Sequence, residues 1–546
     1  MVLTLCTGLL LGCYFETNDD LVLIFLLRGT GMLAPASNMH LYFHGLAPLL
    51  AKLYSLQPTV PWYGLLLYSL LTASAILVFK ALDPYLARLS NSRRIGVLCF
   101  FFFLTYAEHV MRMNFTRPPI LLAGATVLYT LHLLRLDRLR LGWVLLGTGL
   151  LLLGWAVRSN GAFVGLLVTA PAVFLVGRAQ RRRAVLVLGW YAAVLVGASL
   201  SLGAAVDSSQ SAYEHLHDIR ARINDYQMYT FHPTQPHDAV AFESVQPWWG
   251  IGDTTLVNRA FYARATRIDL NFWARKVVPP KAASLLGRLA SDYFLYLVLN
   301  ALLIWALFRA CPGPERRLAW WWLLYSAFIG GLLLALGIGM QLPPRVASPA
   351  LTLYTLVNFC YIFPRLTPSA VYSLPRSFQL AGLGLALLLT LTYAGKTAAR
   401  SYRHGQEKRE NEQYLAQLRA QVGRQPLVVA SLYNSFRSLS PLKNYDLGGG
   451  LVYMLNGWTA NDPSQRAVLR ALVGDVTYHQ AMNALARRAD VVWAFPRGFS
   501  SFFTRYLSAF SQQAPAFCPI APTFPDAAQA DFPQLHRVCP AAAVAP

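Results

Sequence analysis

The stretch "YFETNDDLVLIFLLRG", residues 14–29, follows directly on a hydrophobic N-terminus, and it decides how the rest of the chain is interpreted. It places three acids, Glu16, Asp19 and Asp20, at the edge of an expected membrane span. Ionisable groups at a membrane boundary are costly, and for that reason they are functional candidates by default. We therefore expect these acids to line a water-filled site at the end of the span.

The composition is that of a polytopic membrane protein. Of 546 residues, 55% are hydrophobic and only 13% are charged, and the mean hydropathy is +0.40. A soluble domain carries about a quarter charged residues. The fold prediction is an α-helical membrane protein with about 11 transmembrane helices. They are expected near residues 1–15, 62–79, 95–108, 118–134, 141–157, 161–177, 184–205, 292–309, 318–340, 346–364 and 377–395.

The distribution of arginines predicts the topology. The chain has a net charge of +22, and its arginines gather in the loops that follow the even-numbered spans. The positive-inside rule then places the N-terminus in the cytoplasm and residues 397–546 outside. Because topology accounts for much of the positive charge, we do not expect nucleic acid as a partner.

The polar C-terminal part, 397–546, is expected to form a small extracytoplasmic α/β domain behind the transmembrane module, 1–396. Short apolar runs such as "PLVVASLY" (426–433) alternate there with helical patterns such as "PSQRAVLRALVGDV" (463–476). Cys518 and Cys539 would be able to form a disulfide in an oxidising compartment. The sequence leaves open whether this domain binds the acceptor or only packs over the site.

Nearly all unusual polar residues fall in the predicted outer loops. These are residues 16–61, 108–117 ("EHVMRMNFTR"), 158–161 ("RSNG"), 206–291 and 341–346 ("QLPPRV"). Singly, each arginine has the ordinary alternative of snorkelling to lipid headgroups, and Trp248 that of an aromatic belt. Together, acids and arginines at one membrane face indicate a site where a carboxylate works beside a phosphate.

At this point the sequence resembles the GT-C class of membrane glycosyltransferases over roughly residues 1–400. The resemblance rests on Asn18–Asp19–Asp20 after the first span, "LYSLQPTVPWYGLLLYSLL" (53–71), "NFTRPP" (114–119), "RSNGAF" (158–163) and "LPPRVASP" (342–349). More distant relatives in the class include oligosaccharyltransferase, protein O-mannosyltransferases and aminoarabinose transferases. The resemblance implies a GT-C-like fold in a bacterial cytoplasmic (inner) membrane, with the site facing outward.

The activity implied by the resemblance is inverting transfer of a sugar from a polyprenyl-phosphate carrier to a glycan, lipid or protein acceptor. Asp19 or Asp20 would be the general base, with a slight preference for Asp20, and Glu108 a second-loop acid. Glu16 is expected to be the most dispensable acid. The candidates for binding the substrate are His109, Arg117, Arg158, Asn160, Trp248, Asp253 and Arg345.

The sequence departs from the class in two places. The "WWD" of oligosaccharyltransferase becomes Trp248, Trp249 and Gly250, and no DxD stands in the second outer loop. Peptide-sequon glycosylation is therefore not implied. No cofactor is expected, and although a divalent metal is possible, no cluster of metal ligands in the sequence supports one.

The main alternatives are a transporter or lipid flippase, and a polysaccharide polymerase or ligase. Transporters commonly show internal repeats and place their polar sites near the membrane midplane. This chain has no convincing repeat, and its unusual polar residues lie at one face. These observations favour the glycosyltransferase.

Overall fold

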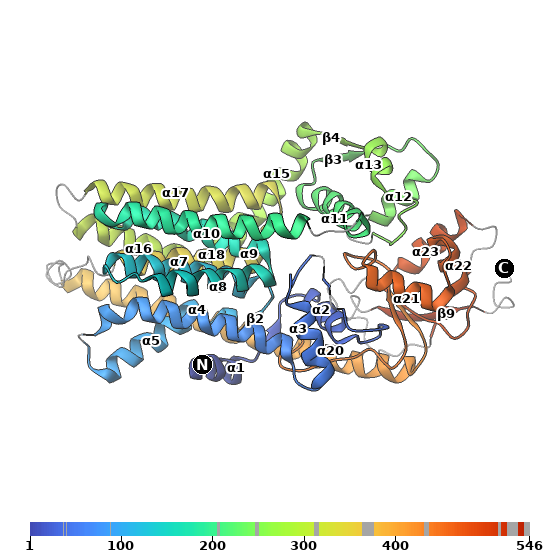
Figure 1. Cartoon of the computed structure of the whole chain (residues 1–546), viewed down its shortest axis with the longest axis horizontal. Helices are drawn as coiled ribbons and strands as arrows, with labels where there is room; N and C mark the ends of the chain where they lie inside the picture. Colours follow the sequence, from blue (N-terminus) through green and yellow to red (C-terminus); the bar gives the residue numbers. More distant parts are fainter. Residues whose placement is uncertain are drawn as a thin grey trace.

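The computed structural model describes the chain except residues 37, 40, 88, 205–207, 246–249, 311–315, 363–375, 431–435, 511–514, 521–532 and 540–546. The molecule is elongated (Figure 1). A bundle of long helices forms one part. The other part, which we call the head, gathers short helices and strands from the beginning, middle and end of the chain.

The bundle contains a helix at each of the eleven predicted apolar segments. Its helices are α1 (Val2–Leu11), α4 (Trp62–Leu86), α5 (Asn91–Thr105), α7 (Arg117–Arg135), α8 (Leu141–Val157), α9 (Ser159–Thr169) continued by η1 (Ala170–Leu175), α10 (Arg178–Ala204), α16 (Phe294–Ala310), α17 (Arg316–Gly339), α18 (Pro344–Ile362) and α20 (Arg376–Val422).

Of these helices, only some of those that the structure describes are long and apolar enough to cross a membrane by themselves. Four meet that test: α4, α10, α17 from Trp320 and α20 from Leu380. A fifth candidate is the pair Leu270–Ser291 and Phe294–Phe308, which is bent by 71°. These helices fit an α-helical membrane protein, whereas the predicted number of about 11 spans is not confirmed.

Two helices outside that count, α7 and α18, are buried along most of their length. Their neighbours are protein, so they can carry polar side chains such as Thr126, whose hydroxyl donates to Leu122 O (2.7 Å). α7 also lies very close to α9, since a Cβ on Gly165 would collide with Ile120 O. Small residues allow such close contact between helices in membranes. A test of helix length and hydropathy therefore does not register these two helices at the centre of the bundle.

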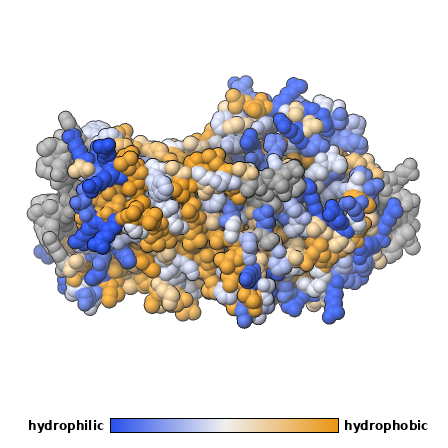
Figure 2. All heavy atoms as spheres, in the orientation of Figure 1, coloured by the Kyte–Doolittle hydropathy of each residue, from blue (hydrophilic) through white to orange (hydrophobic). Residues whose placement is uncertain are grey.

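The two ends of the bundle differ in charge. At the end away from the head, three described stretches rich in arginine lie close together: ion pairs join Arg183 to Asp137 (3.2 Å) and Arg94 to Asp83, and Arg135 Nη1 donates to the Tyr85 hydroxyl (3.1 Å). We call this the arginine end. On the face seen in Figure 2, hydrophobic residues cover the bundle and hydrophilic residues gather toward both ends of the molecule. This pattern fits a bundle with lipid around its middle.

The head begins with the opening acidic stretch. Its first elements are β1 (Tyr14–Phe15), α2 (Asp19–Arg28), α3 (Ala47–Leu56), α6 (Ala107–Met111) and β2 (Arg112–Met113). β1 and β2 pair in parallel, with Tyr14 opposite Arg112, and this pairing brings the first and second loops together. The third part of the head is the long loop, with α11 (Ser208–Tyr226), β3 (Tyr229–Phe231), α12 (Asp238–Val245), α13 (Arg259–Ala265), β4 (Thr266–Ile268), α14 (Leu270–Phe272), η2 (Trp273–Val277) and α15 (Val278–Ser291).

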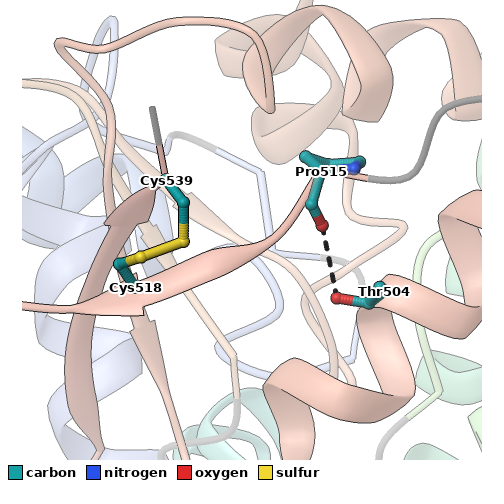
Figure 3. The surroundings of a disulfide bond; sticks show 4 residues. All are labelled: Thr504, Pro515, Cys518 and Cys539. Carbon is teal, nitrogen blue, oxygen red and sulfur yellow. Dashed lines mark hydrogen bonds between the residues drawn. A yellow bond between two sulfur atoms is a disulfide. The ribbon is translucent and has the colours of Figure 1, made fainter. Parts of the chain in front are cut away.

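The C-terminal part of the head is a small α/β domain. Its sheet has the order β6-β5-β7-β9-β8, in which β6, β5 and β7 are parallel and β9 and β8 antiparallel. The elements are β5 (Leu427–Val429), β6 (Val452–Met454), α21 (Pro463–Val473), α22 (Tyr478–Leu485), β7 (Val492–Phe495), α23 (Phe499–Ser508), β8 (Phe517–Pro519) and β9 (Gln534–Val538). Cys518 and Cys539 form a disulfide between β8 and the residue after β9 (Figure 3).

This domain is joined firmly to the rest of the protein. α20 continues without a break past residue 397, where the domain was expected to begin. Backbone hydrogen bonds dock the domain on the first loop: Phe15 N donates to Leu439 O (2.8 Å), and Val452 N donates to Gly31 O (2.7 Å). One hydrophobic core runs through the bundle and the domain. The C-terminal domain is therefore packed against the first loop as an integral part of the head.

Candidate active site

Acids and arginines from separate loops form what we call the buried ion-pair chain: Glu16, Glu108, Arg112, Arg117, Asp292 and Arg400. At its centre, Arg117 Nε donates to Glu16 Oε2 (2.7 Å), and Arg112 Nη2 lies 3.6 Å from Glu16 Oε1. The Arg117 side chain is fully buried and that of Glu16 is 5% exposed. The parallel β1–β2 pairing explains this contact, because it sets the residue after β1 beside the start of α7.

His109 contacts Arg117 through a second nitrogen of the guanidinium. Arg117 Nη1 lies 2.9 Å from His109 Nδ1, and a guanidinium can only donate, so Nδ1 must accept. The ring proton is then on Nε2, which donates to Thr352 Oγ1 (2.9 Å). Burial and the two neighbouring arginines lower the pKa of His109 well below its usual value, which keeps the ring neutral. Arg117 Nη2 has no hydrogen-bond partner among the described residues.

Glu108 links the buried ion-pair chain to α20. Arg400 Nη1 donates to Glu108 Oε1 (3.0 Å), and Arg112 Nη1 approaches the same oxygen at 3.5 Å. Arg400 Nη2 also donates to Asp292 Oδ1 (2.5 Å). Glu108 was a candidate catalytic acid, but here its carboxylate is shared by two arginines. It is better placed to hold helices together than to accept a proton.

The charge of Glu16 is set by its arginines. Burial by itself would raise the pKa of Glu16, but Arg117 and Arg112, with Arg345 further away, lower it to about 2. The carboxylate is thus ionised at neutral pH and neutralises Arg117. This is a central structural position for an acid that the sequence suggested to be dispensable.

Asp20 is fully buried, and both its oxygens are occupied. Oδ1 accepts from the Tyr63 hydroxyl (2.7 Å) and Phe115 N (3.1 Å). Oδ2 accepts from Asn114 Nδ2 (2.8 Å) and Thr17 Oγ1 (3.2 Å). Burial raises the pKa of Asp20 to about 7, against the opposing effect of these donors. A pKa near 7 suits a general base, but reach to the substrate is the first requirement, and this carboxylate joins three segments of protein.

Asp19 has a different environment. It is only half-buried, and among the described residues its carboxylate accepts one side-chain hydrogen bond, from Trp458 Nε1 of the C-terminal domain (3.2 Å). The Trp458 ring also meets Tyr42 edge-on, with ring centres 5.5 Å apart. Asp19 therefore keeps acceptor capacity that Asp20 lacks, so of the two carboxylates Asp19 is the better placed to accept a proton.

Two of the predicted arginines lie around Tyr42. The Arg158 guanidinium lies over the rings of Tyr42 (5.1 Å) and Phe115 (4.9 Å). Burial raises the pKa of Tyr42, Arg158 lowers it, Asp19 raises it and Arg345 lowers it, so all three charges are near that hydroxyl. Asp19, Tyr42, Arg158 and Arg345 form what we call the open cluster.

Asp253 and Asn160 are not brought into this cluster. Asp253 is buried and accepts from the Tyr506 hydroxyl (2.7 Å), and it caps its own turn through Thr255 N (2.9 Å). It joins the long loop to the C-terminal domain. Asn160 is exposed in the first turn of α9. Trp248 lies outside the described residues.

The structure also adds residues that sequence reasoning missed. Neither Arg112 nor Tyr42 was among the residues that the sequence predicted to bind the substrate. Trp458 lies far along the chain, and no motif marks it. Spacing gives no signal for such a contact, because it depends on how the C-terminal domain docks.

Among the residues that the structure describes, no group of three or more His, Cys, Asp or Glu side chains could hold a metal ion. Comparisons with known proteins supply no further guide to this site: no family model, curated protein or solved structure matches the chain.

Proposed function

We propose that this protein is a membrane glycosyltransferase that moves a sugar from a polyprenyl-phosphate carrier to an acceptor, with Asp19 as general base. The observation that carries the proposal is the open cluster. It combines an available carboxylate with two arginines at one end of a bundle that has several helices fit to cross a membrane.

The chemistry assigns each group a task. The Asp19 carboxylate takes the proton of the acceptor hydroxyl as its oxygen bonds to the anomeric carbon. The bond from that carbon to the phosphate oxygen breaks, and its electron pair leaves with the lipid phosphate. Fixed positive charge stabilises the departing phosphate, and Arg158 and Arg345 can supply it. Attack opposite the phosphate inverts the sugar.

Arg117 is a further candidate for binding the phosphate. It is fully buried, Glu16 neutralises it, and its Nη2 has a free donor among the described residues. A buried donor without a partner is costly, so such a group commonly has a water or ligand that satisfies it. A phosphate oxygen would do so.

The test is a donor-cleavage assay. The purified protein in liposomes receives a polyprenyl-phosphate hexose and a solubilised envelope extract as the acceptor source, and mass spectrometry measures released polyprenyl phosphate. We expect release by the wild type and by Asp83→Asn at the arginine end, but not by Asp19→Asn. Movement of intact donor across the bilayer without cleavage would instead indicate a flippase.

A further inference from the structure

A pocket opens beside Asp19, between the long loop and the C-terminal domain. One wall is a single face of α11, with Tyr213, His217, Arg220 and Asn224 at spacings of four, three and four residues. Gly457, Trp458 and Asn461 form the facing wall, and Val245 and Gly250 complete the lining.

Hydrogen bonds within the long loop and across to the facing wall hold the pocket in shape. The Tyr213 hydroxyl donates to Trp458 O (2.8 Å), and Arg220 Nη2 donates to Ile251 O (3.0 Å). The Asn461 amide satisfies its neighbours when its nitrogen donates to Gly252 O (2.7 Å) and its oxygen accepts from Arg220 Nη1 (3.2 Å). The pocket is thus built from the long loop and the C-terminal domain.

The pocket borders the open cluster on two sides. Trp458 lines it and at the same time donates to Asp19. His217 lines it as well, and Arg158 is close enough to help burial lower the pKa of that ring. A molecule held in the pocket would therefore lie next to the carboxylate that the proposed reaction uses to accept a proton.

The lining has a distinct chemistry. Its described residues supply two aromatic rings, an arginine, a histidine that burial keeps neutral and two asparagine amides, but no carboxylate. Amides and a neutral imidazole can both donate to and accept from hydroxyl groups. An aromatic face suits the apolar CH face of a sugar ring. Arg220 is the one charged side chain among the described lining residues, and it suits a neutral or acidic ligand.

We propose that this pocket is the acceptor subsite and that it binds a neutral or acidic carbohydrate, with Trp458 as the platform that places a hydroxyl near Asp19. The role of the bound carbohydrate as acceptor rests on the proposed function. The binding of a carbohydrate in this pocket does not depend on that function.

The test measures binding, so it needs no donor. The detergent-purified full chain is applied to an array of neutral and acidic oligosaccharides, and the bound structures are titrated by saturation-transfer NMR. We expect the wild type to bind a subset of them. Asn224→Ala should bind about fivefold to tenfold more weakly, as expected for one lost hydrogen bond, and Trp458→Ala should lose binding. Asn91→Ala at the exposed start of α5 is the matched control and should bind as the wild type does.

The thermal unfolding temperature of each variant shows whether weaker binding comes from the lost contact or from an unfolded protein. Asp19→Asn should still bind carbohydrate. If it does, and no preparation cleaves a donor, the carbohydrate site stands and the transferase does not. The inference is overturned if the wild type binds no arrayed carbohydrate, if it binds only lipid vesicles or peptides, or if folded Asn224→Ala and Trp458→Ala bind as tightly as the wild type.

Discussion

The buried ion-pair chain and the open cluster lie side by side in the head, yet they use the same residue types in opposite ways. In the chain, Glu16 and Glu108 each face two arginines, so their charges are neutralised and their oxygens occupied. In the open cluster, Asp19 is half-buried with one donor, and Arg158 lies against rings instead of a carboxylate. Among the described residues, arginines occupy the carboxylates of the buried ion-pair chain, whereas the Asp19 carboxylate keeps unused capacity to accept hydrogen bonds.

The largest effect is expected at Asp19. Asp19→Asn keeps the size of the side chain and can still accept from Trp458, but it removes the proton acceptor. General-base catalysis contributes about 10²–10⁴-fold, so sugar transfer should fall by that factor while the unfolding temperature stays near that of the wild type. Donor cleavage in liposomes and thermal unfolding in detergent measure the two quantities. A variant that retains wild-type turnover would remove Asp19 from the chemistry.

Glu16 should show the reverse pattern. Glu16→Gln leaves fully buried Arg117 without its counter-charge, and breaking a buried ion pair in this way costs about 3–5 kcal/mol of folding free energy. The unfolding temperature should therefore drop clearly. Glu243→Gln, whose ion pair with Arg505 is largely exposed, is the control and should change little. An unaltered unfolding temperature for Glu16→Gln would mean that the buried ion-pair chain does not stabilise the head.

These two expectations show where sequence reasoning succeeded and where it stopped. Apolar runs located all eleven bundle segments, because burial in lipid or protein favours helices of this composition. The arginine pattern grouped the described stretches around residues 93–94, 135–140 and 178–183 at one end of the bundle, while the orientation of the chain in the membrane stays a prediction. The ranking of Glu16, Asp19 and Asp20 was beyond reach, because it depends on partners nearly a hundred residues or more away: Arg117 for Glu16, Asn114 for Asp20 and Trp458 for Asp19.

Acid should separate the two regions as well. The pKa of Glu16 is lowered from 4.5 to about 2, so its contribution to stability is present above the unfolded value and is lost as pH falls from about 4.5 toward 2. A shift of that size corresponds to about 3 kcal/mol. Below pH 4.5 the wild type should lose more thermal stability per pH unit than Glu16→Gln, which has no proton to take up at this position. Parallel unfolding curves for the two proteins between pH 5 and about pH 3 would contradict the role of Glu16 as an ionised partner.

The smallest effect, and the finest test of the comparison, concerns Arg345 in the first turn of α18. It is half-buried and close enough to Tyr42 and Glu16 to lower the pKa of both. A residue that only anchors the helix to headgroups needs positive charge alone, whereas one that grips a departing phosphate uses the planar fork of the guanidinium. Arg345→Lys keeps the charge and removes the fork, so we expect about a tenfold loss of donor cleavage, equivalent to one charge-assisted hydrogen bond. Arg138→Lys, exposed at the arginine end, supplies the same exchange away from the site and should retain full activity. If Arg345→Lys is as active as that control, Arg345 is an anchor, and Arg158 is left as the arginine of the open cluster that binds the phosphate.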